Sequence, residues 1–237
     1  MWKYQGFKLV LMLMGLASLA ACFDNEPEER EKFIKFLNSH YINQAGSGVA
    51  DLTEDSLVGK DIGPYFKYHN EVFTYYQDEA DRLMEPKVKS IQALLPLSYD
   101  NIPETIASLE KGKEDVARLL ADNEAIYQKT LDRKNRLKMP DDLKAVYDQA
   151  FEKIVAKNYK ALATLFGEPV IELFEARIKL LQFIEGHQGE IKISGSRLEV
   201  GDPALMNEIK PLMDESNKKG RAWEKMRNEV KAHIRNR

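Results

Sequence analysis

The fold is decided by the stretch DDLKAVYDQAFEKIV, which spans residues 141–155. Its apolar side chains recur at intervals of three or four residues, and this spacing gathers them on one face of an α-helix. They are Leu143, Val146, Tyr147, Ala150, Phe151, Ile154 and Val155. Two aspartates follow Pro140, as is typical of a helix start, because acidic side chains are stabilised at the positive end of a helix. The stretch therefore predicts an amphipathic helix that packs against other helices.

The same helical spacing continues on both sides of this stretch, interrupted by glycine and proline. It predicts further helices over residues 27–45, over residues 103–138, from Val170 to Ile184, and from Pro203 onward. Within the segment 103–138, the apolar stripe is broken by the polar residues Asn123, Thr130 and Arg133. We therefore expect a bundle helix with one hydrated end there, rather than a strict coiled coil.

Between the last two helices the apolar period changes to two residues, which predicts a pair of β-strands. Ile191 and Ile193 precede a short Ser-Gly-Ser turn, and Leu198 and Val200 follow it. We expect these four side chains to share one face that packs on the helices, because an isolated hairpin is only marginally stable in water. The whole pattern predicts an all-α fold, an elongated multi-helix bundle with one small β-hairpin insertion near residues 190–200.

The N-terminal segment has the parts of a secretory signal peptide. Residues 1–8 carry two lysines, and residues 9–16 form an apolar run that is followed by small residues. The run is too short for a membrane-spanning helix, which needs about 20 residues. The segment ends in Leu19-Ala20-Ala21-Cys22, which resembles the lipobox of bacterial lipoproteins. The alternative is an uncleaved anchor, or an ordinary signal that releases the protein.

The lipobox resemblance implies cleavage between Ala21 and Cys22 and the attachment of acyl chains, such as palmitate, at Cys22, the sole cysteine of the chain. We therefore expect a signal peptide over residues 1–21, a short tether over residues 22–26, and a single helical domain over residues 27–237. Such a protein is lipid-anchored on the periplasmic side of the cell envelope.

The residues after the cysteine bear on the choice of membrane. In enteric lipoproteins, Asp directly after the cysteine favours retention in the inner membrane, and a bulky aromatic residue there has a similar bias. Here Phe23 takes that place and Asp24 stands one position later. The inner membrane is therefore favoured over the outer membrane.

Composition narrows the function further. The chain has 237 residues and a net charge of −3, and this mildly acidic total argues against a nucleic-acid binder. Its histidines (His40, His69, His187 and His233) show no metal-binding spacing, and no serine lies in a Gly-x-Ser-x-Gly motif. We therefore expect no cofactor, no metal and no enzymatic activity. A catalytic pair of carboxylates is the exception that sequence motifs do not reveal, because such a pair comes together only in the folded protein.

Aromatic residues crowd one segment, and two interpretations of it stay open. They are Tyr65, Phe66, Tyr68, Phe73, Tyr75 and Tyr76. In the first interpretation their faces form a stacking platform for the rings of a glycan. In the second they fill the core, while the tyrosine hydroxyls reach toward the surface.

The C-terminal segment is rich in basic residues. Those that we consider for contact with anionic lipid head groups are Lys218, Lys219, Arg221, Lys225, Arg227 and Lys231. The alternative is that Trp223, Met226 and Val230 close the bundle while the basic side chains are simply solvated.

Two parts of the sequence resemble a known family. They are CFD at residues 22–24, with REKFI at residues 30–34, and DDLKAVYDQAF at residues 141–151. These segments are similar to the YiaF-type lipoproteins of enteric bacteria, a family whose domain has no assigned function. The resemblance implies lipidation and one helical domain along most of the chain, and it implies no catalytic residues.

These patterns predict a lipid-anchored lipoprotein of the cell envelope that acts as a binding or scaffolding module. Its expected partners are the membrane, through the N-terminal lipid, and an envelope protein or glycan. The alternative function is that of a peptidoglycan or glycan binder, or a glycan-active enzyme, which uses the aromatic region from Tyr65 to Tyr76.

Overall fold

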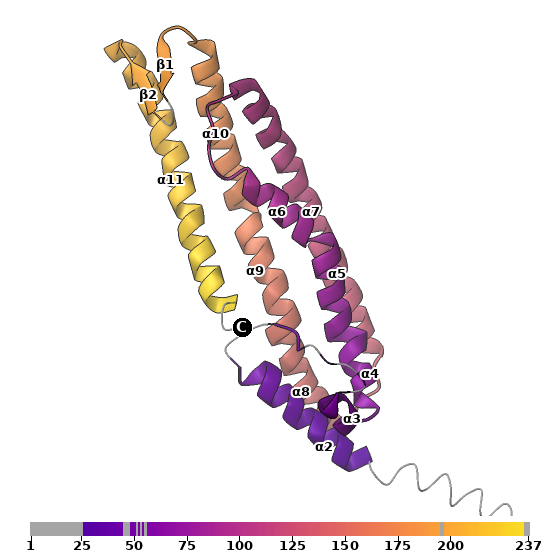
Figure 1. Cartoon of the computed structure of the whole chain (residues 1–237). Helices are drawn as coiled ribbons and strands as arrows, with labels where there is room; N and C mark the ends of the chain where they lie inside the picture. Colours follow the sequence, from indigo (N-terminus) through magenta and orange to yellow (C-terminus); the bar gives the residue numbers. More distant parts are fainter. Residues whose placement is uncertain are drawn as a thin grey trace, which may run out of the picture.

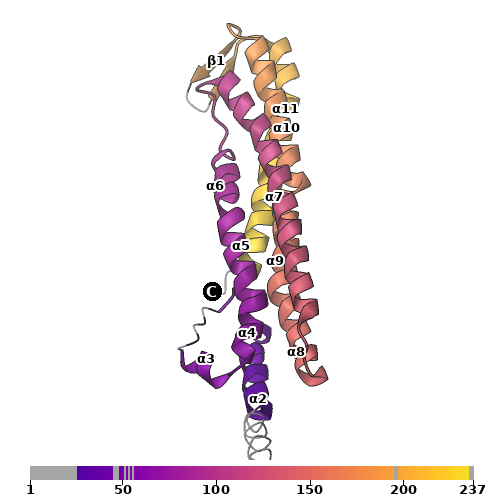
Figure 2. The same cartoon turned by 90° about the vertical axis from the view of Figure 1, so that its right-hand side faces the viewer.

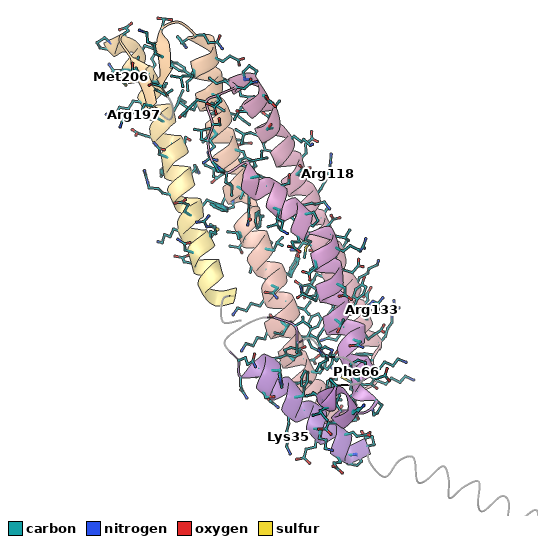
Figure 3. The ribbon with its side chains drawn as sticks, viewed as in Figure 1. Lys35, Phe66, Arg118, Arg133, Arg197 and Met206 are labelled. Atoms are coloured by element: carbon teal, nitrogen blue, oxygen red, sulfur yellow. The ribbon has the colours of Figure 1, made fainter. Side chains whose placement is uncertain are left out.

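The structure is a computed structural model that describes residues 26–44, 48–50, 52, 54, 56–194 and 197–234, with side chains up to residue 229. Columns of helix lie side by side in an elongated bundle (Figure 1, Figure 2). The first described helix lies at one end, which we call the base, and a β-hairpin lies at the opposite end, the tip (Figure 1). Lys35 and Phe66 mark the base, and Arg197 and Met206 mark the tip (Figure 3). The predicted fold class is confirmed.

The described elements follow one another with short connections. In chain order they are α2 (Glu26–Leu37), the π-helical turn η1 (Asn38–Ile42), α3 (Leu57–Asp61), α4 (Tyr65–His69), the π-helical turn η2 (Asn70–Thr74), α5 (Tyr75–Leu83), α6 (Glu85–Ala93), α7 (Ile102–Arg136), α8 (Asp141–Phe151), the π-helical turn η3 (Glu152–Ala156), α9 (Lys157–Phe166), α10 (Glu168–Gly186), β1 (Ile191–Ser194), β2 (Arg197–Val200) and α11 (Pro203–Ile234).

The fold-deciding stretch forms α8 and η3, and α9 and α10 continue the same column toward the tip (Figure 1). Its predicted face is buried, with Leu143, Tyr147 and Ala150 all inaccessible to water. The long helix α7 runs back along this column from the tip to the base, and α5 and α6 lie along α7 (Figure 2). On the other side, α11 packs against α10. The core therefore extends along the bundle axis.

Two polar residues of α7, Asn123 and Thr130, are buried in the bundle, which corrects the expectation that they mark a hydrated end of the helix. Asn123 is 1% exposed and Thr130 is inaccessible. The Thr130 hydroxyl donates to the carbonyl of Ile126 at 2.7 Å, and the Asn123 amide donates to the carbonyl of Tyr159 at 3.0 Å. These two hydrogen bonds let the side chains lie within the apolar stripe, although the amide oxygen of Asn123 is buried without a hydrogen-bond partner.

The predicted hairpin is present at the tip. β1 and β2 are antiparallel, with Ile191 opposite Val200 and Ile193 opposite Leu198, so the four apolar side chains share one face as expected. Ile191 is buried, whereas Ile193 is 41% exposed. The hairpin therefore packs on the helices mainly through the end that adjoins α10 and α11.

Candidate functional site

The aromatic stretch from α4 to α5 lies in the core near the base. Tyr65, Phe73 and Tyr76 are buried, and the half-buried Tyr68 donates its hydroxyl hydrogen to the carbonyl of Lys138 at 2.7 Å. A sugar platform needs an open ring face, and the buried rings do not offer one. The structure therefore favours the alternative that Tyr65, Phe73 and Tyr76 fill the core, whereas Phe66, Tyr68 and Tyr75 are half-buried.

A buried polar pair lies among these rings. The Tyr41 hydroxyl, in η1, donates to Nε2 of His69 at 2.5 Å and accepts from the backbone N–H of Ala50 at 3.2 Å. Nδ1 of His69 lies 3.3 Å from the side-chain oxygens of both Asn70 and Thr74. A neutral imidazole that carries its proton on Nδ1 satisfies all of these contacts. The pair thus ties η1 to the end of α4 across the base.

Burial controls the protonation of this pair. Loss of hydration lowers the pKa of His69 to about 4, against the smaller opposing effect of its hydrogen bond with Asn70. Burial likewise raises the pKa of Tyr41. Both side chains are inaccessible to water. Because the two side chains are buried and bonded to each other, we assign the pair a structural role in the base rather than a role in ligand binding.

The basic residues of α11 do not form a single surface. Lys219 is ion-paired with Glu172 at 2.7 Å, Arg227 is turned onto the ring of Trp223, and the side chain of Lys231 lies outside the described residues. The remaining three are exposed, and their spacing places them on one face of the helix; they are Lys218, Arg221 and Lys225.

A cavity of about 390 Å³ opens between α11, α10 and the end of α6. Trp223 closes the bundle beside it: the indole is 3% exposed and donates through Nε1 to the carbonyl of Leu165 at 3.2 Å. The lining is partly apolar and partly charged. It consists of Gln92, Leu95, Pro96, Leu173, Arg177, Gly220, Trp223, Glu224 and Arg227.

Two guanidinium groups line this cavity, and among the described residues neither is ion-paired with a carboxylate. Arg177 donates from Nη1 to the carbonyl of Leu94 at a long 3.5 Å, and Arg227 lies 5.1 Å from the centroid of the Trp223 ring. The Nε atoms of both arginines are buried without a hydrogen-bond partner. Burial also lowers the pKa of Arg177 to about 10. The cavity is therefore an electropositive pocket with unused donors, and we call it the arginine pocket.

The arginine pocket was not foreseen from the sequence. Arg227 was grouped with the basic residues considered for lipid contact, and Arg177 was not singled out. Two local signals were available. Arg177 falls within the apolar face of the predicted helix from Val170 to Ile184, and Gly220 stands inside a helix, where glycine costs about 1 kcal/mol relative to alanine.

The predicted cleavage and lipidation site, Ala21 and Cys22, lies outside the described residues. Within the described part of the chain, no helix has both the length and the apolar character to cross a membrane. In that same part, no three side chains of His, Cys, Asp or Glu gather in a way that can hold a metal ion.

A family model described as "Protein of unknown function (DUF3053)" matches residues 9–231. The chain belongs to this family. The DUF3053 chain is also similar to the uncharacterized protein YiaF of Escherichia coli K12, of Escherichia coli O157:H7 and of Shigella flexneri. Each is 28% identical over 191 residues, which cover 77% of this chain and 76% of the relative. No solved structure matches the DUF3053 chain. The resemblance noted from residues 22–34 and 141–151 is confirmed at the level of the family.

Proposed function

We propose that this DUF3053 protein is a lipid-anchored lipoprotein of the cell envelope that binds a ligand or partner without catalysis. The observation that carries the proposal is the motif Leu19-Ala20-Ala21-Cys22, placed directly before a folded helical domain. Acyl chains on Cys22 hold such a domain at the bilayer, since two or more chains anchor a protein stably. The inner membrane is the proposed location, with the domain on its periplasmic side.

The short distance between the anchor and the bundle supports this arrangement. Only residues 23–25 separate Cys22 from Glu26, where α2 begins. A fully extended chain over that interval spans at most about 14 Å. A lipid on Cys22 therefore keeps the base at the bilayer surface. Leu57, in α3 at the same end, is 85% exposed and suits contact with the lipid interface.

The shape of the bundle favours binding or scaffolding at some distance from the membrane. The chain extends from α2 at the base to the hairpin at the tip as a continuous stack of helices (Figure 1). The arginine pocket lies between the columns rather than in the base, so it stays open to the periplasm when the base rests on the bilayer. We propose this pocket as the binding site of the module.

The anchor is tested by replacing the cysteine. In cells that express the full chain, Cys22→Ala is expected to abolish incorporation of a labelled fatty acid and to leave the precursor uncut. The wild-type protein should stay with the membrane pellet after a detergent-free high-salt wash. Measurements are metabolic labelling, mass spectrometry of the N-terminus, and fractionation.

Ser18→Ala serves as the matched control, because it changes a nearby small residue and keeps the cysteine. We expect it to be labelled and processed like the wild type. An unlabelled wild-type protein, or release of the wild type by the wash, contradicts the anchor.

The exposed basic face of α11 is proposed as a second, weaker membrane contact, which the bundle makes when it tilts on its short tether from the upright position until α11 meets the bilayer. Each basic residue near an anionic surface adds about 1 kcal/mol, so replacing Lys218, Arg221 and Lys225 together by Gln should weaken binding to phosphatidylglycerol vesicles by about 100-fold. The lipid-free domain without residues 1–22 is used in sedimentation, so that neither the lipid anchor nor the apolar leader masks the effect. Equal binding to anionic and neutral vesicles would reject this contact.

A further inference from the structure

We propose that the arginine pocket binds a small organic monoanion, in which a carboxylate or phosphodiester group is joined to an apolar body. Arg177 and Arg227 would hold the charged group, and Trp223 with Leu173 and Pro96 would contact the apolar part. This inference rests on the binding role proposed above and names the chemical class of its ligand.

The charge of the lining selects the ligand class. The charged side chains of the lining are Arg177, Arg227 and Glu224. Two positive charges and one negative charge leave the pocket with one net positive charge. The charge of Glu224 acts on Arg177 and partly opposes the effect of burial on the Arg177 pKa. Guanidinium groups bind oxyanions through paired N–H donors, and they do so most strongly where water is partly excluded. A ligand with a single negative charge therefore balances the pocket.

The unused donors point to a ligand rather than to packing alone. Arg177 is half-buried, and the hydrogen bond that its guanidinium makes among the described residues is the long contact to the carbonyl of Leu94 at the end of α6. A partly buried cation with so little compensation costs stability. An oxyanion in the cavity would supply the missing partner. Burial lowers the pKa of Arg177 to about 10, and the charges of Tyr99 and Glu224 oppose this shift only in part.

Gly220 provides an independent observation. A Cβ atom at this position would lie 3.9 Å from Leu173 Cδ1 and 4.0 Å from Arg177 Nη2, which are ordinary contacts. The packing of the helices therefore does not require a glycine here. Gly112 in α7 is different, because its Cβ would lie 2.8 Å from the ring of Phe174. A glycine that costs helix stability and is not demanded by packing keeps space open beside Arg177.

The size of the cavity sets the size of the ligand. A volume of about 390 Å³ lies in the range of small-molecule sites. It accommodates an oxyanion together with a short alkyl or ring system, and half of the lining offers apolar contacts. The carboxylate could come from a fatty acid or a metabolite, and the phosphodiester from a lipid head group, so both forms of the oxyanion are tested.

Trp223 allows the binding to be measured directly. The sequence contains two tryptophans, Trp2 and Trp223, so Trp2→Phe leaves Trp223 as the sole reporter. The full chain with this background is titrated with hexanoate and with diethyl phosphate, and with their neutral counterparts hexanamide and triethyl phosphate. We expect a saturable change in Trp223 emission with at least one anion and a much weaker response to its neutral counterpart. Hexanoate alone would identify a carboxylate ligand, and diethyl phosphate alone a phosphodiester.

Variants separate the pocket from general charge and from folding. Arg177→Gln and Arg227→Gln are each expected to weaken anion binding by about tenfold or more, the effect of one lost charged hydrogen bond. Lys210→Gln is the matched control, since it removes an exposed positive charge from the same helix, and it should bind like the parent. Gly220→Ala should keep or raise the melting temperature and still weaken binding, so it remains informative if Arg177→Gln unfolds.

Three results would overturn the proposal. They are the absence of a saturable response to either anion, equal responses to anion and neutral counterpart, or unchanged affinity in both Arg227→Gln and Gly220→Ala. Each of them leaves the membrane fractionation of the wild type and Cys22→Ala unaffected, so failure of the pocket is distinguishable from failure of the lipid anchor.

Discussion

Phe174→Ala is expected to lower the free energy of unfolding by about 3–5 kcal/mol, the cost of deleting a fully buried aromatic ring. Phe174 lies in α10, is inaccessible to water, and its ring lies against Gly112 of α7. Gly112 permits this approach, because a Cβ there would lie 2.8 Å from Phe174 Cε2 and 2.7 Å from Leu94 Cδ1. Loss of the ring leaves a cavity at the junction of three helices, which the rigid backbones cannot close. Urea denaturation followed by circular dichroism measures the change.

Phe183→Ala, further along the same helix, is the matched control. Its ring is half-buried and stacks on His187 at 4.3 Å near the end of α10. We expect a markedly smaller loss of stability, because part of the ring already contacts water. Similar losses in the two variants would contradict the assignment of Phe174 to the centre of the core. Phe174→Leu should recover part of the stability, since it refills most of the cavity.

Acid is expected to destabilise the protein through His69, and the effect should be large. The folded protein holds the His69 pKa at about 4, whereas the ordinary value is 6.5. Between these values the unfolded chain binds the proton and the folded protein does not, so unfolding takes up a proton and becomes easier as the pH falls. Full stability from this source is present above pH 6.5. Roughly 3 kcal/mol is lost on the way to pH 4, at 1.36 kcal/mol per unit of pKa difference.

The test compares the pH dependence of unfolding in the wild type and in His69→Gln. The amide can still accept the hydrogen bond of the Tyr41 hydroxyl but does not titrate, so the variant should be less stable at pH 7 and show a flatter slope between pH 6.5 and 4. Carboxylates contribute to both slopes, and the difference between them isolates His69. His187→Gln, at the end of α10, is the control and should keep the contribution of His69. Parallel slopes for the wild type and His69→Gln would contradict the prediction.

The helices and the hairpin could be predicted because their signals are local. The stripe of Leu143, Tyr147 and Ala150 repeats with the helical period, and all three are buried as expected. The change to a period of two around Ile191 and Val200 likewise predicted the paired strands. Each pattern lies within a few turns of chain and reflects the need to bury one apolar face, so it can be recognised without knowing the neighbouring helices.

The polar positions were harder to assign. Asn123 and Thr130 were expected to mark a hydrated end, yet both are buried. Thr130 bonds to its own helix, a contact that spacing alone allows, whereas Asn123 bonds to the carbonyl of Tyr159 on another helix. A pattern of apolar residues does not show whether a polar side chain has a partner elsewhere in the chain, and that partner decides between hydration and burial.

The amino-acid pattern was enough to specify the helices, the hairpin and the family, because each is written in neighbouring residues, and it also predicts the leader with its lipobox. Tertiary structure alone decided which groups meet: Tyr41 with His69, and Arg177 with Arg227 across a cavity that Gly220 leaves open. These residues come from separate helices, and their spacing along the chain carries no trace of their distance in space. Burial then sets their chemistry, since it lowers the pKa of His69 and leaves Nε of both pocket arginines without a hydrogen-bond partner.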